Sequence, residues 1–187
     1  NLLGFDCGPG NALMDGWCLR HTGRDFDDAG RWGAQGKVHG ALLAKLFDEP
    51  FFTKPPPKST GRDLFNGLWL ADKLAGMTAV LPQDVQATLA ELTAVSCASS
   101  LLDNSTNCKT LVVCGGGALN DFLMARLQAA LPNCRVTSSA ELGLPPLQVE
   151  ATAFAWLARQ TIRGQTSSLK SVTGALGARI LGGIYPA

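Results

Sequence analysis

Short apolar runs alternate with helical patterns along this chain, and glycine-rich turns follow two of the runs. The first run, residues 2–6, predicts a strand that ends in a tight turn at Gly8 and Gly10. A helix capped by Asn11 should follow, and Gly23 is expected to stop it. The apolar face of this helix is expected to hold Leu13, Met14 and Trp17.

The middle of the chain predicts a loop and three helices. Residues 25–36 are rich in Gly and Asp and lead to a helix that should end before Pro50. Its buried side is expected to hold Val38, Leu42, Leu43 and Leu46. Three consecutive prolines within residues 54–58 remove three backbone donors, which predicts an extended surface loop. Helices are expected at 63–74 and, entered through Pro82, at 83–102.

The second glycine-rich turn follows a fully apolar run at residues 110–114. Strand, glycine turn and helix is the arrangement that brings backbone amides to a nucleotide. The helix after the turn should carry Leu119, Phe122, Leu123 and Leu127. A strand at 134–136, a helix at 149–163 and a terminal run at 179–185 complete an α/β lobe, with a central sheet and helices on both faces.

Composition narrows the class of protein. The 187 residues suffice for one domain or one lobe of a two-lobed enzyme. Hydrophobic residues make up 46% and charged residues 17%, so we expect another lobe or subunit to cover part of the surface. The net charge of +1, with no basic run interleaved with aromatics, argues against nucleic acid as a partner. No run approaches the roughly 20 apolar residues of a membrane span.

The six cysteines form no C-x-x-C pair and no Cys/His cluster, which argues against zinc. Their even number is compatible with disulfides in a secreted protein. Several lie within apolar helix or strand patterns, however, and this favours buried free thiols in a reducing cytoplasm. His21 and His39 have no partner at motif spacing, and we assign them no chemistry.

Asp6 and the first glycine turn are the first candidate site. Glycines let the backbone approach phosphate oxygens, and the N-terminus of the next helix adds donors. A carboxylate there could accept a proton from an attacking hydroxyl or water, or hold a magnesium ion. An ordinary glycine turn capped by Asp6 explains this motif equally well when it is taken alone.

The second candidate is the ledge formed by Gly115, Gly116 and Gly117, on which an adenine or ribose can rest, with the Asn120 amide nearby. A Rossmann fingerprint fits poorly, because its third glycine would fall at Asn120. A plain tight turn remains an alternative.

Two further groups of polar residues have a functional and a structural interpretation. Lys58, Ser59, Thr60 and Arg62 could bind a sugar, a phosphate or a partner lobe, but a solvated loop with Ser59 or Thr60 near a helix cap is favoured in isolation. Glu150 opens a helix, where a carboxylate is usually just favourable to the helix dipole.

Taken together and in order, these segments resemble the anhydro-N-acetylmuramic acid kinase family. The resemblance is carried by GFDCGPGN with MDGW, FDDAGRWGAQGKV, PPPKSTGRDLFN, PQDVQATLAELTA, VCGGGALNDFLM, VEATAFAWLA, and VTGA with LGGIYPA. It implies an actin-like ATPase (ribonuclease H-like) lobe with a central mixed sheet flanked by helices. ATP and Mg²⁺ would bind between two lobes. The residues that would bind the metal ion are not assigned.

The resemblance also implies a reaction and roles for residues. The family opens 1,6-anhydro-N-acetylmuramic acid with water and phosphorylates O6, giving N-acetylmuramic acid 6-phosphate and ADP in cytoplasmic peptidoglycan recycling. By resemblance, Asp6 is the general base and Glu150 a second acid near the sugar. The phosphate loop would comprise Gly8, Pro9, Gly10 and Asn11, and the adenosine site Gly115, Gly116, Gly117 and Asn120.

The resemblance places residues 1–187 in the C-terminal, nucleotide-binding lobe of a two-lobed, homodimeric kinase. The family's N-terminal G-T-S-x-D-G phosphate motif is not in this sequence, so we expect the isolated chain to be inactive. Cys7 stands where Thr is common, Leu147 where an acid is usual, and residues 166–168 replace a P-G-N turn. The alternative function is a non-catalytic nucleotide-binding module of the same fold.

Overall fold

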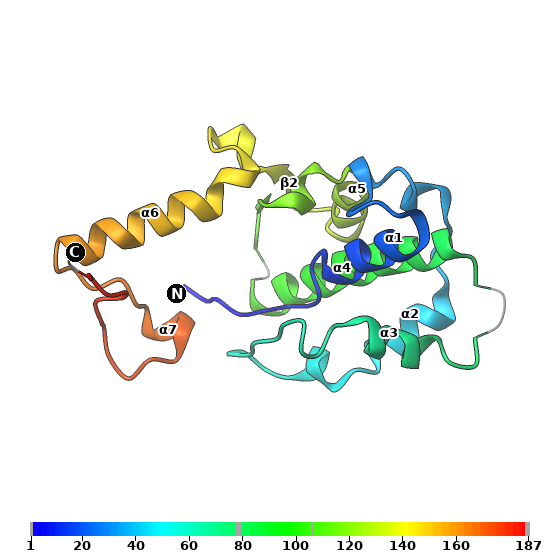
Figure 1. Ribbon diagram of the computed structural model, residues 1–187, viewed down its shortest axis with the longest axis horizontal. Coiled ribbons are helices and arrows are strands. Elements are labelled where there is room, and N and C mark those ends of the chain that lie inside the picture. The colour runs from blue at the N-terminus through cyan, green and yellow to red at the C-terminus, as the bar shows by residue number, and fades with distance from the viewer. Residues whose placement is uncertain (1, 78–79, 106, 186–187) are drawn as a thin grey trace.

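The computed structural model describes residues 2–77, 80–105 and 107–185, and the long helix α4 (Pro82–Asn104) forms its spine (Figure 1). Pro82 lies at the first turn, where its missing N–H costs nothing. Helices α1 (Ala12–Thr22), α2 (Gly40–Phe47) and α5 (Asp121–Ala130) pack against α4. Small buried residues of α4, among them Ala87, Ala90 and Ala94, let these helices approach closely. The prediction of a helix entered through Pro82 is confirmed.

The core lies where α1, α2 and α4 meet a cluster of aromatic side chains. Leu42, Leu46, Leu89 and Leu92 are fully or almost fully buried. Phe65 contacts the ring of Phe51 edge to face at a centroid separation of 5.6 Å and that of Trp69 at 5.1 Å. These are favourable aromatic geometries, and they anchor helix α3 (Gly67–Leu74) beside α1 and α2.

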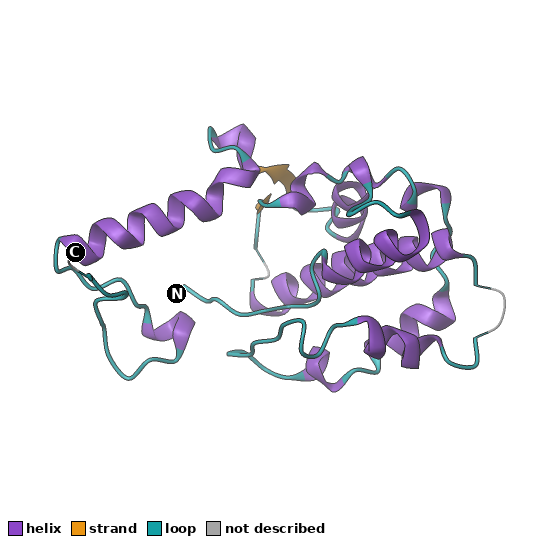
Figure 2. Cartoon of the chain, in the orientation of Figure 1, coloured by secondary structure: helices purple, strands orange, loops and turns teal. Residues whose placement is uncertain are grey.

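The sheet in the described part of the chain has two parallel strands, β1 (Thr110–Val113) and β2 (Arg135–Ser138), joined by α5 (Figure 2). Both strands were predicted. The expected central mixed sheet with helices on both faces is wrong for the described residues, since residues 2–6 and 179–185 join no sheet and alternate positions of β1 are exposed. Apolar runs alone do not make a sheet, because each strand needs a neighbour for its backbone groups.

Some helices begin or end at other residues than predicted, because a side chain that caps the helix sets its first residue. Gly23 adopts a left-handed conformation (φ 73°) and ends α1 as predicted, but the Asn11 side chain makes no cap hydrogen bond. Nδ1 of His39 accepts a 3.1 Å hydrogen bond from the N–H of Leu42, so α2 begins at Gly40. Val38 therefore precedes the helix and is 37% exposed rather than buried.

Two further helices begin later than predicted. Asn66 caps α3, since its Oδ1 accepts hydrogen bonds of 3.0 Å from the N–H groups of Leu68 and Trp69, and the helix starts at Gly67 instead of residue 63. Leu119 belongs to the 3₁₀ turn Gly116–Leu119, is 52% exposed and lies outside α5. The extended proline loop at residues 54–58 is confirmed.

Helix α6 (Val149–Ile162) projects from the body of the fold, and the short helix α7 (Lys170–Thr173) follows it (Figure 1). The predicted helix is present, but none of its residues is buried. Phe154 is 64% exposed and Ile162 76% exposed. Residues 186 and 187, the end of the quoted LGGIYPA segment, lie outside the described residues.

Helix α4 is an exception to the expectation that no segment approaches the length and apolar character of a membrane span. Its 23 residues make it long and apolar enough to cross a bilayer by length and composition alone. In the described fold, 56% of that window is buried inside the protein, and its residues form much of the core. The apolar character of α4 thus serves packing.

Candidate active site

One cavity of about 530 Å³ brings the two glycine turns together. The first turn contributes Asp6, Gly8, Gly10 and Asn11, and the second contributes Gly115, Gly116 and Gly117. Helix α4 supplies the wall between them through Thr93, Ser96 and Cys97. This space is called the glycine cavity below. The predicted phosphate-loop glycines and the predicted adenosine-site glycines therefore face one site, although more than 100 positions separate them in the sequence.

The Asn11 side chain lies against the second glycine turn. A Cβ atom on Gly116 would lie 3.3 Å from Asn11 Nδ2, and one on Gly117 would lie 3.3 Å from Asn11 Oδ1. Both distances are tighter than ordinary van der Waals contact, so the absence of side chains leaves room for the amide. This is a cradle that larger residues would fill, which fits the close backbone approach that a nucleotide requires.

A second cavity of about 350 Å³ adjoins the glycine cavity and shares Asn11 and Gly116 with it. Asn120 lines this second cavity together with Asp15 and Phe26. Burial raises the pKa of the Asp15 carboxyl above its ordinary value, and the nearby charge of Arg62 opposes that shift. Two spaces that share Asn11 and Gly116 as lining residues are a candidate for the two ends of one elongated ligand.

The remaining residues predicted to form the site lie outside the lining of the glycine cavity. Asn120 Oδ1 accepts a 2.9 Å hydrogen bond from the N–H of Leu123 and so caps α5, which leaves the amide NH₂ for a ligand. Pro9 and Glu150 are absent from the described lining of the glycine cavity. Glu150 is exposed in the first turn of α6. The segment just before α6 contacts the second glycine turn, because the N–H of Gly115 donates a 3.0 Å hydrogen bond to Pro146 O.

Asp6 is held by the loop that follows the three prolines. Its Oδ2 accepts hydrogen bonds from Ser59 Oγ at 2.8 Å and from the Thr60 N–H at 2.9 Å. Its own N–H donates a 3.0 Å hydrogen bond to Lys58 O. No described residue donates to Oδ1. One carboxylate oxygen is thus fixed, and the other is free to accept a proton at the cavity.

Ser59 and Thr60 contact the predicted base Asp6, a partner that the sequence pattern did not indicate. The favoured interpretation placed them on a solvated loop near a helix cap, whereas Asn66 caps the next helix and these two residues orient Asp6. The small polar pair after a proline run was the available signal. Sequence spacing could not identify a partner 53 positions away.

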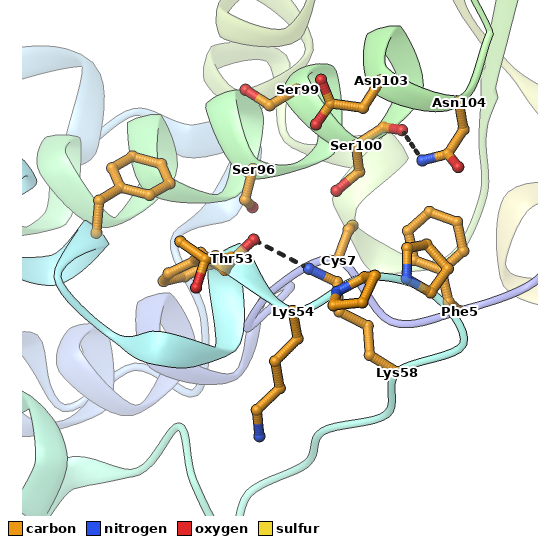
Figure 3. A pocket seen from close by; sticks show the side chains of 14 residues that line it. Phe5, Cys7, Thr53, Lys54, Lys58, Ser96, Ser99, Ser100, Asp103 and Asn104 are labelled. Carbon is orange, nitrogen blue, oxygen red and sulfur yellow. Dashed lines mark hydrogen bonds between the residues drawn. The ribbon is translucent and has the colours of Figure 1, made fainter.

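Lys58 stabilises the loop that carries Ser59 and Thr60. Its Nζ donates hydrogen bonds of 3.2 Å to the carbonyls of Phe51 and Phe52 and lies 4.8 Å from the centroid of the Phe51 ring. Lys58 also lines a cavity of about 580 Å³ that shares Cys7 with the glycine cavity, shown in Figure 3. The ammonium group is therefore engaged with backbone oxygens, and this favours a structural role for Lys58.

Helix α4 supports the first glycine turn. A Cβ atom on Gly8 would lie 2.5 Å from Ser96 Oγ, so a larger residue here would force the Ser96 side chain to shift. Thr93 Oγ1 donates a 2.9 Å hydrogen bond to Gly10 O, and Gly10 itself adopts a positive φ of 57°. The turn is thus pinned to the rigid core helix on one side of the cavity.

All six cysteines are free. Cys18 and Cys134 are buried, Cys7, Cys97 and Cys108 are partly buried, and Cys114 is exposed. Free thiols were predicted, although burial holds for only two of the six. The partly buried pair Cys7 and Cys97 lines the glycine cavity.

The two glycine turns leave room for ATP at this site. For Mg²⁺, in contrast, no ligands are assigned. Among the described residues, no three His, Cys, Asp or Glu side chains group closely enough to hold a metal ion by themselves. Magnesium bound to a nucleotide needs only one or two carboxylates in addition to phosphate oxygens and water. The described site is compatible with such an ion but identifies no ligand for it.

The strand β1, its glycine turn and helix α5 define this chain as an α/β protein with a nucleotide-binding type of site. Residues 1–187 match the family model described as anhydro-N-acetylmuramic acid kinase, and the chain belongs to that family. The resemblance identified from the sequence motifs is confirmed.

Curated relatives agree with the family match. The chain is 63% identical over 187 residues to an anhydro-N-acetylmuramic acid kinase of Albidiferax ferrireducens, of which it covers 48%. It is 60% identical to the protein of that name from Variovorax paradoxus and 55% identical to that from Burkholderia cenocepacia, covering 50% of each. In all three comparisons 100% of this chain is aligned. The chain spans about half the length of the curated relatives it matches.

Proposed function

We propose that this chain forms part of an ATP-dependent kinase that opens 1,6-anhydro-N-acetylmuramic acid with water and phosphorylates O6. The products would be N-acetylmuramic acid 6-phosphate and ADP. The observation that carries the proposal is the glycine cavity, where a carboxylate with one free oxygen lies beside two glycine turns. The names of the relatives supply the substrate.

Asp6 would act as the general base in this reaction. Its free Oδ1 would take a proton from the water that attacks the anomeric carbon of the sugar. The bond from that carbon to the bridging oxygen breaks, and the released O6 attacks the γ-phosphate. Ser59 and Thr60 would keep the carboxylate in place by holding Oδ2. Glu150 remains a proposed second acid near the sugar.

The two glycine turns would divide the nucleotide between them. Gly8, Pro9, Gly10 and Asn11 would lie along the phosphates, where the N-terminus of α1 adds unpaired N–H groups. The adenosine would rest on Gly115, Gly116 and Gly117 and extend toward the Asn120 amide. Asn11 and Gly116 line both cavities, which supports a ligand that extends from one to the other.

An actin-like ATPase architecture with a second lobe completes this proposal. The described sheet of two strands is small for such a lobe, and the relatives are about twice as long as this chain. The exposed apolar side chains of α6, such as Phe154 and Ile162, supply a surface for the other half. Mg²⁺, when bound with ATP, would neutralise charge on the phosphates. A homodimer in the cytoplasm is the proposed form of the complete enzyme.

The test is turnover by a full-length protein that carries this chain. ADP release would be followed in a coupled assay with ATP and the anhydro sugar, and the product identified by mass spectrometry. In ¹⁸O-labelled water, one labelled oxygen should enter the sugar at the anomeric carbon, because water attacks there. ATP binding without sugar-dependent ADP release would instead support a non-catalytic nucleotide-binding module.

A further inference from the structure

Two cysteines meet where the parallel strands begin. Cys108 lies two residues before β1, and Cys134 directly precedes β2. Their Sγ atoms are 3.8 Å apart, although 26 positions separate the two residues in the sequence. Both are free thiols, and Cys134 is 5% exposed whereas Cys108 is half-buried. The fold therefore brings an accessible sulfur into contact with a buried one.

The position of Cys134 is fixed by helix α5. Gln128 Nε2 donates a 3.0 Å hydrogen bond to the carbonyl of Cys134, and Gln128 Oε1 accepts one of 3.0 Å from the N–H of Val136. The Cys134 side chain also packs with Leu131 in a small apolar cluster, against which Cys108 lies. Cys134 is thus a stationary partner that faces the second sulfur.

Cys108 is held less firmly and is the sulfur that a reagent reaches first. Its Sγ donates a hydrogen bond of 3.3 Å to Thr110 O, and a thiol is a weak donor. Burial, together with the neighbouring Cys108 sulfur, raises the pKa of the Cys134 thiol. Cys134 therefore keeps its proton and is shielded from solvent, so that the reaction begins at Cys108.

A bond between these sulfurs would close the unit that carries the second glycine turn. Residues 108–134 contain β1, the glycines at 115–117 and helix α5. The two strands lie side by side (Figure 2), and a parallel pair of only four residues a strand is weakly held. At their start, the N–H of Arg135 donates a 2.9 Å hydrogen bond to Lys109 O. A covalent link beside this hydrogen bond would oppose separation of the strands.

We propose that Cys108 and Cys134 form a reversible disulfide when the protein meets glutathione disulfide, and that this bond holds β1 to β2. A disulfide places its sulfurs about 2.05 Å apart, so the two atoms need to approach by less than about 2 Å. Because α5 fixes Cys134, we expect Cys108 to make most of this movement. The inference is independent of the reaction that the complete protein catalyses.

The exchange balances in two steps. The Cys108 thiolate attacks one sulfur of glutathione disulfide, the S–S bond of the reagent breaks, and one glutathione leaves as a thiolate that takes up a proton. The Cys134 sulfur then attacks the Cys108 sulfur of the mixed disulfide, and the second glutathione leaves with the Cys134 proton. The two cysteines lose two electrons in total, and glutathione disulfide is reduced to two thiols. A dithiol such as dithiothreitol reverses the bond in the same way.

Peptide mapping tests the disulfide directly. The full-length protein is treated with glutathione disulfide, blocked with iodoacetamide and digested without reductant. A peptide pair joined through Cys108 and Cys134, two hydrogens lighter than the reduced pair, is expected. Cys108→Ser should abolish it, whereas Cys114→Ser, which changes an exposed cysteine of the same segment, should leave it intact. In Cys134→Ser, glutathione should remain attached to Cys108, because the second thiol is absent.

Two results of the mapping would overturn the proposal. One is wild-type protein in which Cys108 stays unmodified or carries glutathione without a link to Cys134. The other is a link from Cys108 to Cys114 in place of Cys134. Either result would show that the two sulfurs do not reach bonding distance in solution.

Hydrogen exchange tests what the bond does to the strands. The amides of β1 and β2, including the Arg135 N–H that bonds to Lys109 O, should exchange at least about tenfold more slowly in the oxidised protein. Exchange in α3 should be unchanged, and dithiothreitol should restore the faster rate. Cys108→Ser treated with the same reagent should show no slowing. A Cys108–Cys134 bond that leaves exchange in β1 and β2 unchanged would contradict the proposed role of the bond.

Discussion

Ser59 Oγ donates a 2.8 Å hydrogen bond to Oδ2 of Asp6, although 53 positions separate the two residues. The contact joins the loop after the prolines to the first glycine turn and leaves the other carboxylate oxygen without a described donor. A general base needs this combination of a fixed position and a free oxygen. We therefore expect Ser59 to position Asp6 in the proposed reaction.

Ser59→Ala should lower kcat by about tenfold and leave the KM for ATP nearly unchanged. Hydrogen bonds to charged groups contribute about 1.5–3 kcal/mol, and the exposure of this pair reduces that value. Ser59→Thr keeps a hydroxyl and should recover most of kcat. Steady-state kinetics with the anhydro sugar provide the measurement. Equal losses in both variants would show that Ser59 does not act through its hydroxyl.

Asp6→Asn should abolish sugar phosphorylation while ATP binding is largely retained, because the amide keeps the shape and loses the basic oxygen. General-base catalysis typically contributes 10²–10⁴-fold, so a loss of at least about a hundredfold is expected. Asp72→Asn on the exposed surface of α3 is the matched control. Turnover within about tenfold of wild type would remove Asp6 from the role of base.

Gly116→Val should weaken ATP binding in calorimetry. The added Cβ would lie 3.3 Å from Asn11 Nδ2, and the two γ-methyl groups would enter the space where the cavities meet. Gly16→Val makes the same change on α1 at a position with nothing within 4 Å, and should bind ATP normally. Unchanged affinity in Gly116→Val would mean that adenosine binds elsewhere.

Cys7 should react with iodoacetamide at a rate that rises through about pH 7, because its lowered pKa makes the nucleophilic thiolate available there. Below this pH the thiol is protonated and the rate should fall. In Cys97→Ala the influence of the neighbouring thiol is lost, so the midpoint should move upward toward the ordinary value of 9.0. Mass spectrometry of the Cys7 peptide across a pH series measures both midpoints. A midpoint near 9 in the wild type would contradict the lowered pKa of Cys7.

The isolated 187-residue chain should show no kinase activity and should self-associate in analytical ultracentrifugation. Transition-state charge on the phosphoryl group needs donors from both lobes of the proposed enzyme. Association is expected to depend on the apolar side chains of α6, so that Phe154→Gln combined with Ile162→Gln reduces it. Leu68→Gln is the control, because Leu68 is 85% exposed on α3, away from α6. Robust turnover by the chain alone would show that the active site lies elsewhere.

Sequence reasoning located most helices because their signals are local. The apolar spacing of Val85, Leu89 and Leu92 identified α4, and the left-handed Gly23 ended α1 as expected. Caps were harder, since Asn66 and His39 compete with neighbouring polar residues for the same role. Only the placement of the backbone decides which side chain reaches the first free N–H groups.

By itself, the sequence determined the family, the two glycine turns and Asp6 as a candidate base. These follow from short motifs in which neighbouring residues act together, and such motifs are legible without a fold. The tertiary structure alone decided that Ser59 and Thr60 hold Asp6, that Asn11 lies against Gly116 and Gly117, and that Cys7 and Cys97 line one cavity. The physical reason is that α4 brings distant segments to one cavity, and contacts across such distances leave no periodic trace in the chain.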